Sequence, residues 1–436
     1  MQLYSTNNKA LRSDFRTAIF KGLPDDNGLY MPLHIPELPD SFFKNLPDLS
    51  FQDIAEQVSL HLLADIIPAN ELKTLVRNAL DFPAPVHQLD EHTGILELFH
   101  GPSLAFKDFG ARYMAALMSY FNKGESKPLT ILVATSGDTG GAVAAGFYKV
   151  PGIEVIILYP SEKVSDLQEK QLTTLGHNVS ALEIDGSFDD CQAMVKKAFL
   201  DTELTQTFRL SSANSINISR LIPQSFYYFE AWKQVMHLNR PVVFSVPSGN
   251  FGNLTAGLFA KRMGLPVHHF IAATNSNDVV PAYLASGAYH PQPSVRTLSN
   301  AMDVGAPSNF VRMLDLYGST WNIMKAEISG YAFNDEQTKA AMQDVYRRFE
   351  YIIDPHAAVG YLAWKAWQAT HQDTNAIGVV LGTAHPAKFL DDVESILERS
   401  IEVPERLARL KHENKVSHKM PPSFEALKEW LKNRSV

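Results

Sequence analysis

The feature that most constrains the fold of this chain is a regular alternation of short apolar runs and helical segments, which begins near residue 93. Apolar runs are present at 95–99, 129–134, 154–159, 179–184, 242–246, 268–273 and 376–381. Most of them precede a segment with helical spacing, an order typical of parallel strands joined by right-handed helical crossovers. We therefore expect an α/β fold with parallel sheets.

Helices are expected between and beyond these runs. Apolar spacing and breaker residues place them at 51–64, 70–80, 142–149, 161–175, 219–236, 254–263, 278–286, 310–317, 335–349, 356–369, 387–398 and 424–431. Ser187 and Asp190 resemble a capping box at the start of a further helix, which carries Cys191. Residues 297–308 have no clear period, and we expect them to form a loop at the site.

The composition of the sequence changes along the chain and divides it into four parts. Prolines break the first ninety or so residues into short pieces, and the proline-rich stretch 81–86 indicates a boundary. We expect residues 1–92 to form an N-terminal segment, 93–210 a smaller α/β domain, 211–400 a larger α/β domain and 401–436 a charged tail. Our hypothesis is that the N-terminal segment packs on the site as a lid or wall that keeps water out.

Charge and cysteine content narrow the partners of the chain. Its 39 basic and 47 acidic residues give a net charge of −8 without any run of lysine or arginine, so neither nucleic acid nor an anionic membrane is expected. Small molecules are the expected ligands. The single cysteine, Cys191, excludes an intramolecular disulfide, and no His-Cys-carboxylate set has metal-ligand spacing. No apolar run has membrane-spanning length, and we expect a cytoplasmic enzyme.

The first candidate for chemistry is Lys107. Apolar residues at helical spacing follow it, so Ser103 can be interpreted as a helix cap, with Lys107 in the first turn. The positive end of the helix dipole and apolar neighbours such as Phe106 favour the neutral amine, which is the nucleophilic form. The alternative is a lysine that extends from a helix start to solvent.

A second candidate is the loop at 248–253, which joins a buried strand to a helix. Its glycines allow the backbone to curl so that several N–H groups converge at the helix N-terminus, an arrangement that binds phosphate. It has neither the Gly-Lys-Ser/Thr ending of a nucleotide loop nor a dinucleotide fingerprint, so a small phosphate monoester fits best. The alternative is a tight turn whose glycines serve packing alone.

A third loop, at 136–140, has the same strand–loop–helix setting. Ser136, Thr139 and backbone donors can hold a carboxylate there, whereas the charge of Asp138 disfavours a second phosphate site. A capped helix start without ligand is the alternative interpretation.

Polar residues at the end of the last strand and near residue 217 complete the candidate set. Thr383 can offer a neutral hydroxyl to a ring nitrogen, while His385 and Lys388 are interpreted as ordinary polar groups of a helix start. Asn217 and Arg220 suit an anionic substrate group, although Arg220 is also compatible with a surface salt bridge. Arg112 is a weaker candidate for the same anion.

A desolvated lysine, a phosphate-binding loop, a carboxylate-binding loop and a neutral partner for a ring nitrogen together indicate a pyridoxal phosphate enzyme that acts on an amino acid. The same residues resemble the threonine synthases of many bacteria and fungi. The matching motifs are YST at 4–6, HGPSLAFKD at 100–108, SGDTG at 136–140, NSIN at 214–217, PSGNFG at 247–252 and GTAHPAKF at 382–389.

This resemblance implies a fold of the tryptophan synthase β-chain type, known as fold type II, with two open parallel-sheet domains facing each other over pyridoxal 5'-phosphate. By motif match, Lys107 carries the Schiff base and Thr383 faces the pyridine nitrogen. The cofactor phosphate is held by Gly249, Asn250, Phe251, Gly252 and Asn253.

The reaction implied by the resemblance converts O-phospho-L-homoserine and water to L-threonine and phosphate. Asn217 and Arg220, with Arg112 behind them, are our hypothesis for the substrate phosphate, and Ser136, Asp138 and Thr139 for the rest of the substrate. Two alternatives stay open: a dehydratase or β-replacement synthase of the same fold, and a non-catalytic phosphate-ligand binder. The sequence does not decide between a monomer and a homodimer.

Overall fold

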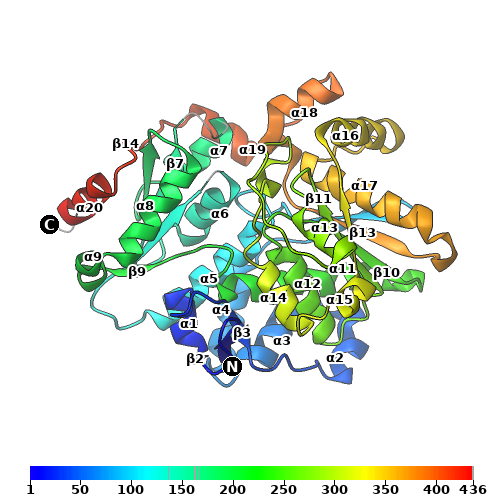
Figure 1. Cartoon of the computed structure of the whole chain (residues 1–436), viewed down its shortest axis with the longest axis horizontal. Helices are drawn as coiled ribbons and strands as arrows, with labels where there is room; N and C mark the ends of the chain where they lie inside the picture. Colours follow the sequence, from blue (N-terminus) through cyan, green and yellow to red (C-terminus); the bar gives the residue numbers. More distant parts are fainter. Residues whose placement is uncertain (136, 162–163, 165, 435–436) are drawn as a thin grey trace.

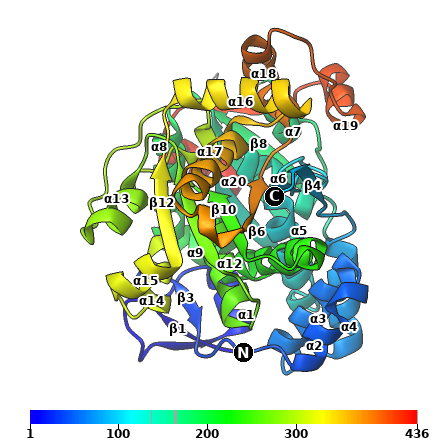
Figure 2. The same ribbon diagram turned by 90° about the vertical axis from the view of Figure 1, so that its right-hand side faces the viewer.

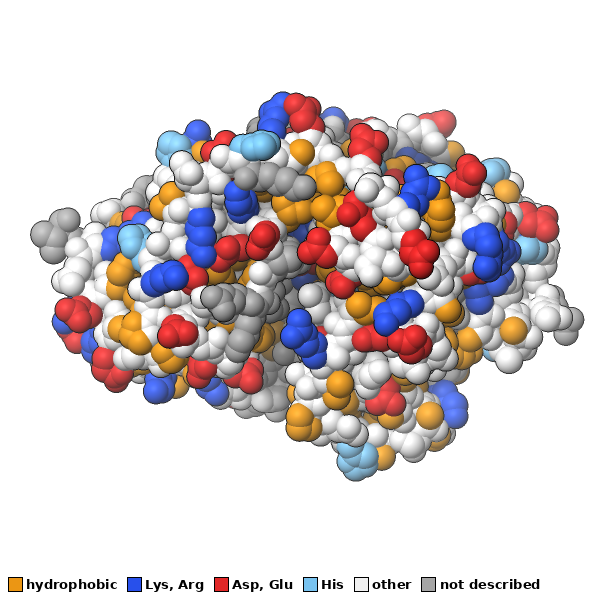
Figure 3. All heavy atoms as spheres, turned by 90° about the horizontal axis from the view of Figure 1, so that it is seen from above, with side chains coloured by type: hydrophobic (Ala, Val, Ile, Leu, Met, Phe, Trp, Pro, Cys, Tyr) orange, Lys and Arg blue, Asp and Glu red, His pale blue; other side chains and the backbone are white. Residues whose placement is uncertain are grey.

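The computed structural model of the chain describes residues 1–135, 137–161, 164 and 166–434. Two sheets with their helices lie side by side, and the N-terminal segment packs beneath them in the view of Figure 1. On the face seen from above, acidic and basic side chains are interspersed (Figure 3). None of the helices in the described part of the chain combines the length and apolar character that crossing a bilayer requires.

The larger sheet has six strands in the order β12 (Ile328–Ala332), β11 (His269–Thr274), β10 (Val242–Pro247), β13 (Ile377–Gly382), β5 (Thr93–Glu97) and β4 (Val86–Asp90). Neighbouring strands are parallel except for the antiparallel edge strand β4. The central strands β10 and β13 are buried throughout, as expected of a parallel sheet covered on both faces.

Successive side chains of β10 enter different cores, because a strand alternates its faces. Val243 belongs to the core formed with Trp364 of α17 (Pro355–Thr370), and α16 (Asp335–Phe349) packs on α17 (Figure 2). Phe244 belongs to the other core, where its ring meets that of Tyr228 at 4.9 Å between centroids. Helices α11 (Phe226–Val235), α12 (Gly252–Arg262), α13 (Val279–Ser286), α14 (Phe310–Leu316) and α15 (Trp321–Glu327) belong to the same half of the molecule.

The smaller sheet has five parallel strands in the order β14 (His418–Met420), β8 (Val179–Ile184), β7 (Ile153–Pro160), β6 (Leu129–Ala134) and β9 (Arg209–Ser211). Its helices are α5 (Lys107–Phe121), α6 (Asp138–Phe147), α7 (Asp166–Thr173), α8 (Phe188–Leu200), α9 (Thr202–Thr207) and α20 (Phe424–Asn433). The C-terminal tail thus completes this sheet with β14 and covers α8 with α20.

The N-terminal segment has a small antiparallel sheet and four helices. They are β1 (Gln2–Ser5), β2 (Arg12–Asp14), β3 (Tyr30–Pro32), α1 (Phe15–Lys21), α2 (Asp40–Asn45), α3 (Phe51–Leu63) and α4 (Ala69–Ala79). Helix α4 packs against α5, and α1 packs against α5 and α10 (Ile218–Leu221). The segment therefore supports the helices that carry Lys107 and Arg220.

Much of the predicted secondary structure is confirmed, including strands 129–134 and 179–184, helix 335–349 and the capping box of Ser187 and Asp190. The single helix predicted at 219–236 is wrong. Pro223 lacks an N–H, and the chain forms α10, a 3-10 turn at Ile222–Ser225 and then α11. Helix α18 (Leu390–Leu397) is likewise preceded by a 3-10 turn at Pro386–Phe389, and α15, β12 and β14 were not predicted.

Sheet membership differs from the predicted boundaries in three places. Strand β4 lies within 1–92, which we expected to be the N-terminal segment, yet it pairs with β5 at the edge of the larger sheet. Strand β5 lies within 93–210, which we expected to be the smaller domain, yet it pairs with β13 of the larger sheet. The tail at 401–436, expected to stand apart, pairs β14 with β8. The last two differences concern pairing between strands far apart in the sequence, which local spacing does not determine.

The order of the strands creates one switch point in each sheet. From β10, successive strands β11 and β12 continue to one side while β13 and β5 lie on the other. From β6, strands β7 and β8 continue to one side while β9 lies on the other. Ligands of open parallel sheets bind beyond the carboxyl ends of strands at such points. The loops after β6 and β10 are therefore the first places to look for a site.

Candidate active site

The loop before α5 is joined directly to the loop after β13. The N–H of Leu98 donates to the carbonyl of Gly382 at 2.9 Å, and the N–H of Phe106 donates to the carbonyl of Thr383 at 2.8 Å. Ala105 forms an isolated antiparallel bridge with Ala384. These contacts fix the start of α5 at the carboxyl ends of the larger sheet's strands.

Lys107 lies in the first turn of α5, as predicted, but it is the first residue of the helix, and Ser103 is not the cap. The cap position is Phe106, which offers no side-chain hydrogen bond. Ser103 lies in the preceding loop, where its N–H donates to Oδ2 of buried Asp108 at 2.8 Å. Leu104, which directly follows Ser103, has φ of 59°, a left-handed conformation that is costly for leucine.

The amine of Lys107 has an environment suited to losing its proton. Its side chain is half-buried. Burial lowers the pKa of Lys107 to about 8, opposed by the charge of Asp138 and assisted by those of Lys388 and Arg220. A lysine with a pKa near 8 is partly neutral at physiological pH, which a nucleophile or general base requires.

Asp138 and Lys388 form a buried ion pair that crosses from one sheet to the other. Asp138 begins α6 of the smaller sheet, and Lys388 lies in the turn after β13 of the larger one. Their Oδ1 and Nζ atoms are 2.7 Å apart, and the side chains are only 5% and 1% exposed. Although burial raises the pKa of Asp138, the charges of Lys388 and Lys107 hold it well below its usual range.

The interpretation of Lys388 as an ordinary polar group of a helix start is therefore wrong. Its amine also donates to the carbonyl of Ser103 at 2.9 Å, and the same carbonyl accepts from Nε2 of Gln171 at 3.1 Å. Gln168 donates to Asp138 at 3.0 Å. These residues form one buried network around the loop that precedes Lys107.

The interpretation of His385 as a helix-start residue is confirmed. Its ring accepts the N–H of Ala387 at 3.1 Å, and burial lowers its pKa to about 4, so that it is neutral. Thr383, between the strand and this turn, is 6% exposed, and its carbonyl holds the Phe106 N–H.

The loop after β6 is organised by the hydroxyl of Thr135. This oxygen accepts the N–H groups of Gly137 at 3.1 Å and Gly140 at 2.8 Å. Gly137 has φ of 149°, which only glycine adopts readily. Thr139 is half-buried in the first turn of α6. The predicted carboxylate ligand Ser136 lies outside the described residues.

The loop at 248–253 is shaped by Asn253. Its Oδ1 accepts the hydroxyl of Ser248 at 2.8 Å, and its Nδ2 donates to the carbonyl of Pro247 at 2.9 Å. Phe251 has φ of 57°, a left-handed conformation immediately before the first residue of α12, Gly252. The loop therefore presents the N-terminus of α12, where unpaired N–H groups favour an anion.

A second loop packs closely on the first. A Cβ on Gly249 would lie 2.8 Å from both the carbonyl oxygen of Ala301 and Cα of Met302, so glycine is required there. The side-chain carbonyl of Asn250 accepts the N–H of Ser308 at 2.5 Å. Residues 297–308, predicted to be a loop at the site, thus lie against the glycine loop, with one 3-10 turn at Asn300–Met302.

Two residues predicted to bind an anion are buried near α10 but differ in availability. Asn217 caps α10: its Oδ1 accepts from the N–H of Ser219 at 3.1 Å, and its Nδ2 donates to the carbonyl of Ile19 at 2.8 Å. Arg220 is 3% exposed and donates from Nη1 to the carbonyl of Ala213 at 2.5 Å. Its Nε has no hydrogen-bond partner among the described residues.

Arg220 lies close to the lysine loop. Burial lowers the pKa of Arg220 to about 10, opposed by the charge of Asp108. Burial also raises the pKa of Asp108 to about 6, although a Ser103 N–H holds one of its oxygens. The other oxygen, Oδ1, is buried and has no hydrogen-bond partner in the described structure.

Arg112, the third residue predicted to bind an anion, forms structural contacts with the N-terminal segment. Its Nη1 pairs with Asp81 at 2.6 Å, and its Nη2 donates to the carbonyl of Asn78 at 2.8 Å. Both acceptors belong to the N-terminal segment, so the guanidinium holds that segment against α5.

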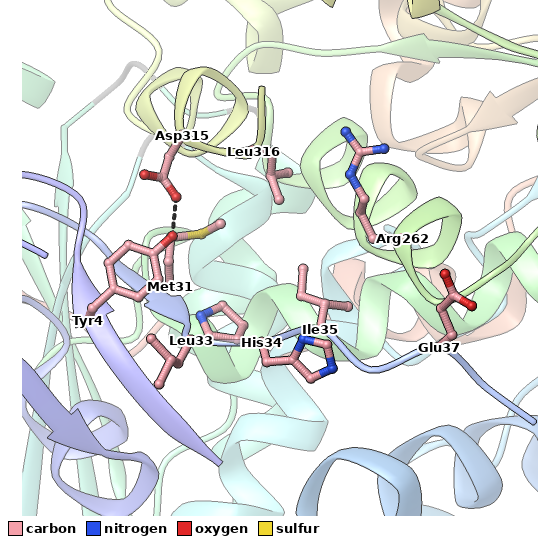
Figure 4. Close-up of a pocket in the computed structure, with 10 residues that line it drawn as sticks. Tyr4, Met31, Leu33, His34, Ile35, Glu37, Arg262, Asp315 and Leu316 are labelled. Atoms are coloured by element: carbon pink, nitrogen blue, oxygen red, sulfur yellow. Dashed lines mark hydrogen bonds between the residues drawn. The ribbon is translucent and has the colours of Figure 1, made fainter. Parts of the chain in front are cut away.

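A cavity of about 630 Å³ lies elsewhere, between the N-terminal segment and α14. Figure 4 shows Tyr4 bonded to Asp315 on one side of it and Arg262 on another. His34 and Glu37, which also line it, are exposed. It is lined by none of the strand-end loops, and so we do not assign it to the site.

Sequence reasoning missed four buried polar residues around the site: Asp108, Gln168, Gln171 and Arg312. Asp108 lies inside the motif HGPSLAFKD, next to Lys107, and this position could have identified it as a site residue. The same holds for Lys388, which was misinterpreted although it lies inside GTAHPAKF. The glutamines of α7 and Arg312 of α14 lie in helices of ordinary composition, where nothing in the sequence separates them from surface residues.

Three family models match the chain and together span most of it. Residues 83–382 match the pyridoxal-phosphate dependent enzymes, residues 2–80 the threonine synthase N terminus and residues 357–431 the threonine synthase C-terminal part. The last two matches include most of the N-terminal segment and of the tail.

Relatives and solved structures agree with this assignment. The threonine synthases of Serratia marcescens and Escherichia coli are each 45% identical to the chain, over 99% of it and 99% and 100% of their own lengths. The crystal structure of the Escherichia coli enzyme covers both chains completely, with a TM-score of 0.91 and 44% identity. The structure of pyridoxal phosphate-bound threonine synthase from Brucella melitensis has a TM-score of 0.93 and 34% identity, covering 100% of this chain and 99% of that one.

More distant structures share the fold alone. Maize serine racemase, for example, is 17% identical with a TM-score of 0.51 over 72% of this chain. The agreement of the full-length relatives with all three family models is decisive, and the chain belongs to the threonine synthase family of pyridoxal phosphate-dependent lyases, with fold type II.

Proposed function

We propose that the chain converts O-phospho-L-homoserine and water to L-threonine and inorganic phosphate. The observation that carries the proposal is Lys107, a half-buried lysine whose pKa is lowered to about 8 and on which the charges of Lys388 and Arg220 act. It follows a loop bonded to the end of β13, and the neighbouring strand β10 leads into the glycine loop. That setting suits a reaction with an amine catalyst, a phosphorylated cofactor and an anionic substrate. The full-length similarity to threonine synthases supports the choice of reaction.

The residues present fit pyridoxal phosphate. The crowding around Gly249 and the left-handed Phe251 leave a curled backbone at the start of α12, which is the shape a phosphate monoester needs. Lys107 would be the covalent attachment point and Thr383 would face the ring nitrogen. The residues proposed to hold the phosphate are Gly249, Asn250, Phe251, Gly252 and Asn253.

When bound, the cofactor supplies an electron sink that stabilises negative charge on the carbon next to the substrate's amino group. Lys107 is proposed to remove the proton from this α-carbon and to return it later, since its amine is partly neutral near pH 8. Loss of a β-proton then allows the γ-carbon–oxygen bond to break, and the phosphate leaves with the bonding electron pair. Water adds its hydroxyl to the β-carbon, and the γ-carbon gains a proton.

Binding of the substrate falls to the loops after β6 and near α10. We propose that Thr139 and the backbone at the start of α6, with Ser136, hold the substrate carboxylate, and that Asp138 positions this loop through its ion pair with Lys388. Arg220 is proposed for the substrate phosphate, because its Nε has no hydrogen-bond partner in the described part of the chain and its charge lowers the pKa of Lys107. Asn217 and Arg112 are not carried forward as ligands, since helix α10 and Asp81 occupy them.

The test is to follow phosphate and threonine together in cofactor-loaded protein given O-phospho-L-homoserine. Equal amounts of both are expected. Phosphate with a keto acid in place of threonine would assign the chain to elimination chemistry, and no product would reject the substrate. Arg220→Met is expected to raise KM for O-phospho-L-homoserine about tenfold or more, whereas an unchanged KM would remove Arg220 from the phosphate site.

We also propose a cytoplasmic location. The sequence has a single cysteine, Cys191, so no intramolecular disulfide can form, as suits a reducing compartment.

A further inference from the structure

Arg312 on α14 is a fully buried cation with no carboxylate partner among the residues that the structure describes. Its side chain is 0% exposed, and among the described residues all its hydrogen-bond acceptors are uncharged. Its Nε and Nη2 donate to the carbonyl of Tyr30 at 3.2 and 2.9 Å, Nη2 also donates to the carbonyl of Ile216 at 2.7 Å, and Nη1 donates to Oδ1 of Asn309 at 2.7 Å.

A buried charge whose hydrogen-bond acceptors in the described structure are all uncharged is unusual. Burial lowers the pKa of Arg312 only to about 9, so the guanidinium is charged at neutral pH. Neutral acceptors satisfy its N–H groups, but they do not offset the cost of removing a full charge from water. Lys388, the comparable buried cation of the site, has Asp138 at 2.7 Å. The charge of Arg312 is therefore available to an anion that the chain itself does not supply.

A single residue, Asn309, connects the guanidinium of Arg312 to the glycine loop at 248–253. Asn309, which accepts from Arg312, also donates its own N–H to the carbonyl of Asn250 at 3.3 Å. A Cβ on Gly252, the first residue of α12, would lie 3.4 Å from Nδ2 of Asn309. Asn309 thus contacts the loop at two points and holds Arg312 behind it.

We propose that Arg312 is the buried counter-charge for the cofactor phosphate. It acts through Asn309 as a positioning residue and makes the chain select the phosphorylated form of the cofactor over the unphosphorylated aldehyde, pyridoxal. This inference rests on the proposed placement of the phosphate at 249–253. It requires no direct contact, because electrostatic attraction in a poorly solvated interior acts over several ångströms.

A structural role alone would give a different result. The hydrogen bonds of Arg312 to Tyr30 join the N-terminal segment to α14, so its loss would weaken the fold and with it the binding of any ligand. Weakened folding affects pyridoxal phosphate and pyridoxal alike, since both present the same aldehyde to Lys107. Loss of a counter-charge affects only the ligand that carries the phosphate.

The experiment is to titrate full-length apo-protein with pyridoxal phosphate and with pyridoxal and to compare the two Kd values. The variants are Arg312→Gln and Arg312→Met, which remove the charge, and Arg312→Lys, which keeps it. Glutamine retains two N–H donors, so one neutral variant is available if methionine does not fold. Arg112→Gln removes an arginine that is paired with Asp81 and serves as the matched control.

We expect the neutral variants to lose about tenfold or more in affinity for pyridoxal phosphate and less than about twofold for pyridoxal, while Arg312→Lys and Arg112→Gln keep the wild-type ratio of Kd values. Equal losses for both ligands, or an unchanged ratio in both neutral variants, would overturn the inference and leave the proposed reaction standing. A wild-type chain without preference for pyridoxal phosphate would instead contradict the phosphate site at 249–253, and the inference would fall with it.

Discussion

Two of the cations buried near the candidate active site, Lys388 and Arg312, have different surroundings. Lys388 is paired with Asp138 at 2.7 Å, and the pair joins the turn after β13 to the start of α6. Arg312 is equally inaccessible but bonds only to uncharged acceptors. The first charge is neutralised within the chain, whereas the second is left without a partner of opposite sign in the part of the chain that the structure describes.

The difference indicates that Lys388 and Arg312 have different roles. The Lys388 side, with Asp138 and the Ser103 carbonyl, sets the electrostatic surroundings of Lys107 and connects the two sheets. The Arg312 side, with Asn309 and the glycine loop, is suited to receiving an anion. Variants that change one side should leave the properties of the other largely intact, because mutations that share no partners are usually additive.

The largest effect is expected from Lys107→Ala. Phosphate release from O-phospho-L-homoserine should fall by about a thousandfold or more, because the amine that moves protons is gone. The Arg312 side is intact in this variant, so pyridoxal phosphate should still bind, without covalent attachment, as equilibrium dialysis can measure. Lys107→Arg is the matched control, since arginine keeps the charge but does not lose its proton and should be as inactive. Activity within tenfold of wild type in either variant would contradict the role of Lys107.

The next effect is on stability. Lys388→Met leaves the carboxylate of Asp138 buried without its cation and should cost about 3–5 kcal/mol in the free energy of unfolding by urea. The double variant with Asp138→Asn should recover part of this loss, because the uncompensated charge is removed. Lys339→Met is the control: its ion pair with Glu336, 2.8 Å long, is exposed and screened by solvent, so its removal should leave the free energy of unfolding nearly unchanged. Equal losses in Lys388→Met and Lys339→Met would show that the Lys388 pair does not stabilise the fold.

The same comparison shows what the sequence can and cannot predict. Strands such as β6 and β8, and helix α16, follow from apolar spacing within a few residues, which is local information. The place of Lys107 in the first turn of α5 also follows from its neighbours, although the exact start of the helix does not. Lys388 looks like any polar residue at a helix start, and only its distant partner Asp138 makes it a buried ion pair. Local spacing carries no signal for such a contact.

Two errors have the same physical origin. Ser103 has the composition of a helix cap, but the carboxylate of Asp108 binds its N–H and holds it in the loop. Arg112 has the charge for an anion site, but Asp81 of the N-terminal segment pairs with it. Asn217 is a different case, because asparagine two residues before Ser219 is a local capping pattern that could have been recognised from the sequence.

A smaller effect is expected on the titration of Lys107 in apo-protein. Its pKa is lowered to about 8 mainly by burial, with Asp138 raising it and both Lys388 and Arg220 lowering it. Asp138→Asn removes the charge that raises the pKa and should move it below 8, while Lys388→Met removes a charge that lowers it and should move it above 8. The rate of acylation of Lys107 against pH, followed by mass spectrometry of its peptide, measures this midpoint.

Arg312 provides the control for these two shifts. The charge of Arg312 is not among the causes of the lowered pKa of Lys107, so Arg312→Gln should leave the midpoint near 8. Shifts in the same direction in Asp138→Asn and Lys388→Met would contradict the proposed control of Lys107 by this pair.

The smallest effect is expected from Arg112→Gln, which tests whether Arg112 also belongs to the candidate active site. Arg112 is 20% exposed in its side chain and paired with Asp81, which is 57% exposed, so solvent screens the pair and its loss should cost less than about 1 kcal/mol. KM for O-phospho-L-homoserine and Kd for pyridoxal phosphate should both stay within about twofold of wild type, because the guanidinium faces the N-terminal segment. A tenfold rise in KM with unchanged stability would instead place Arg112 in the substrate phosphate site beside Arg220.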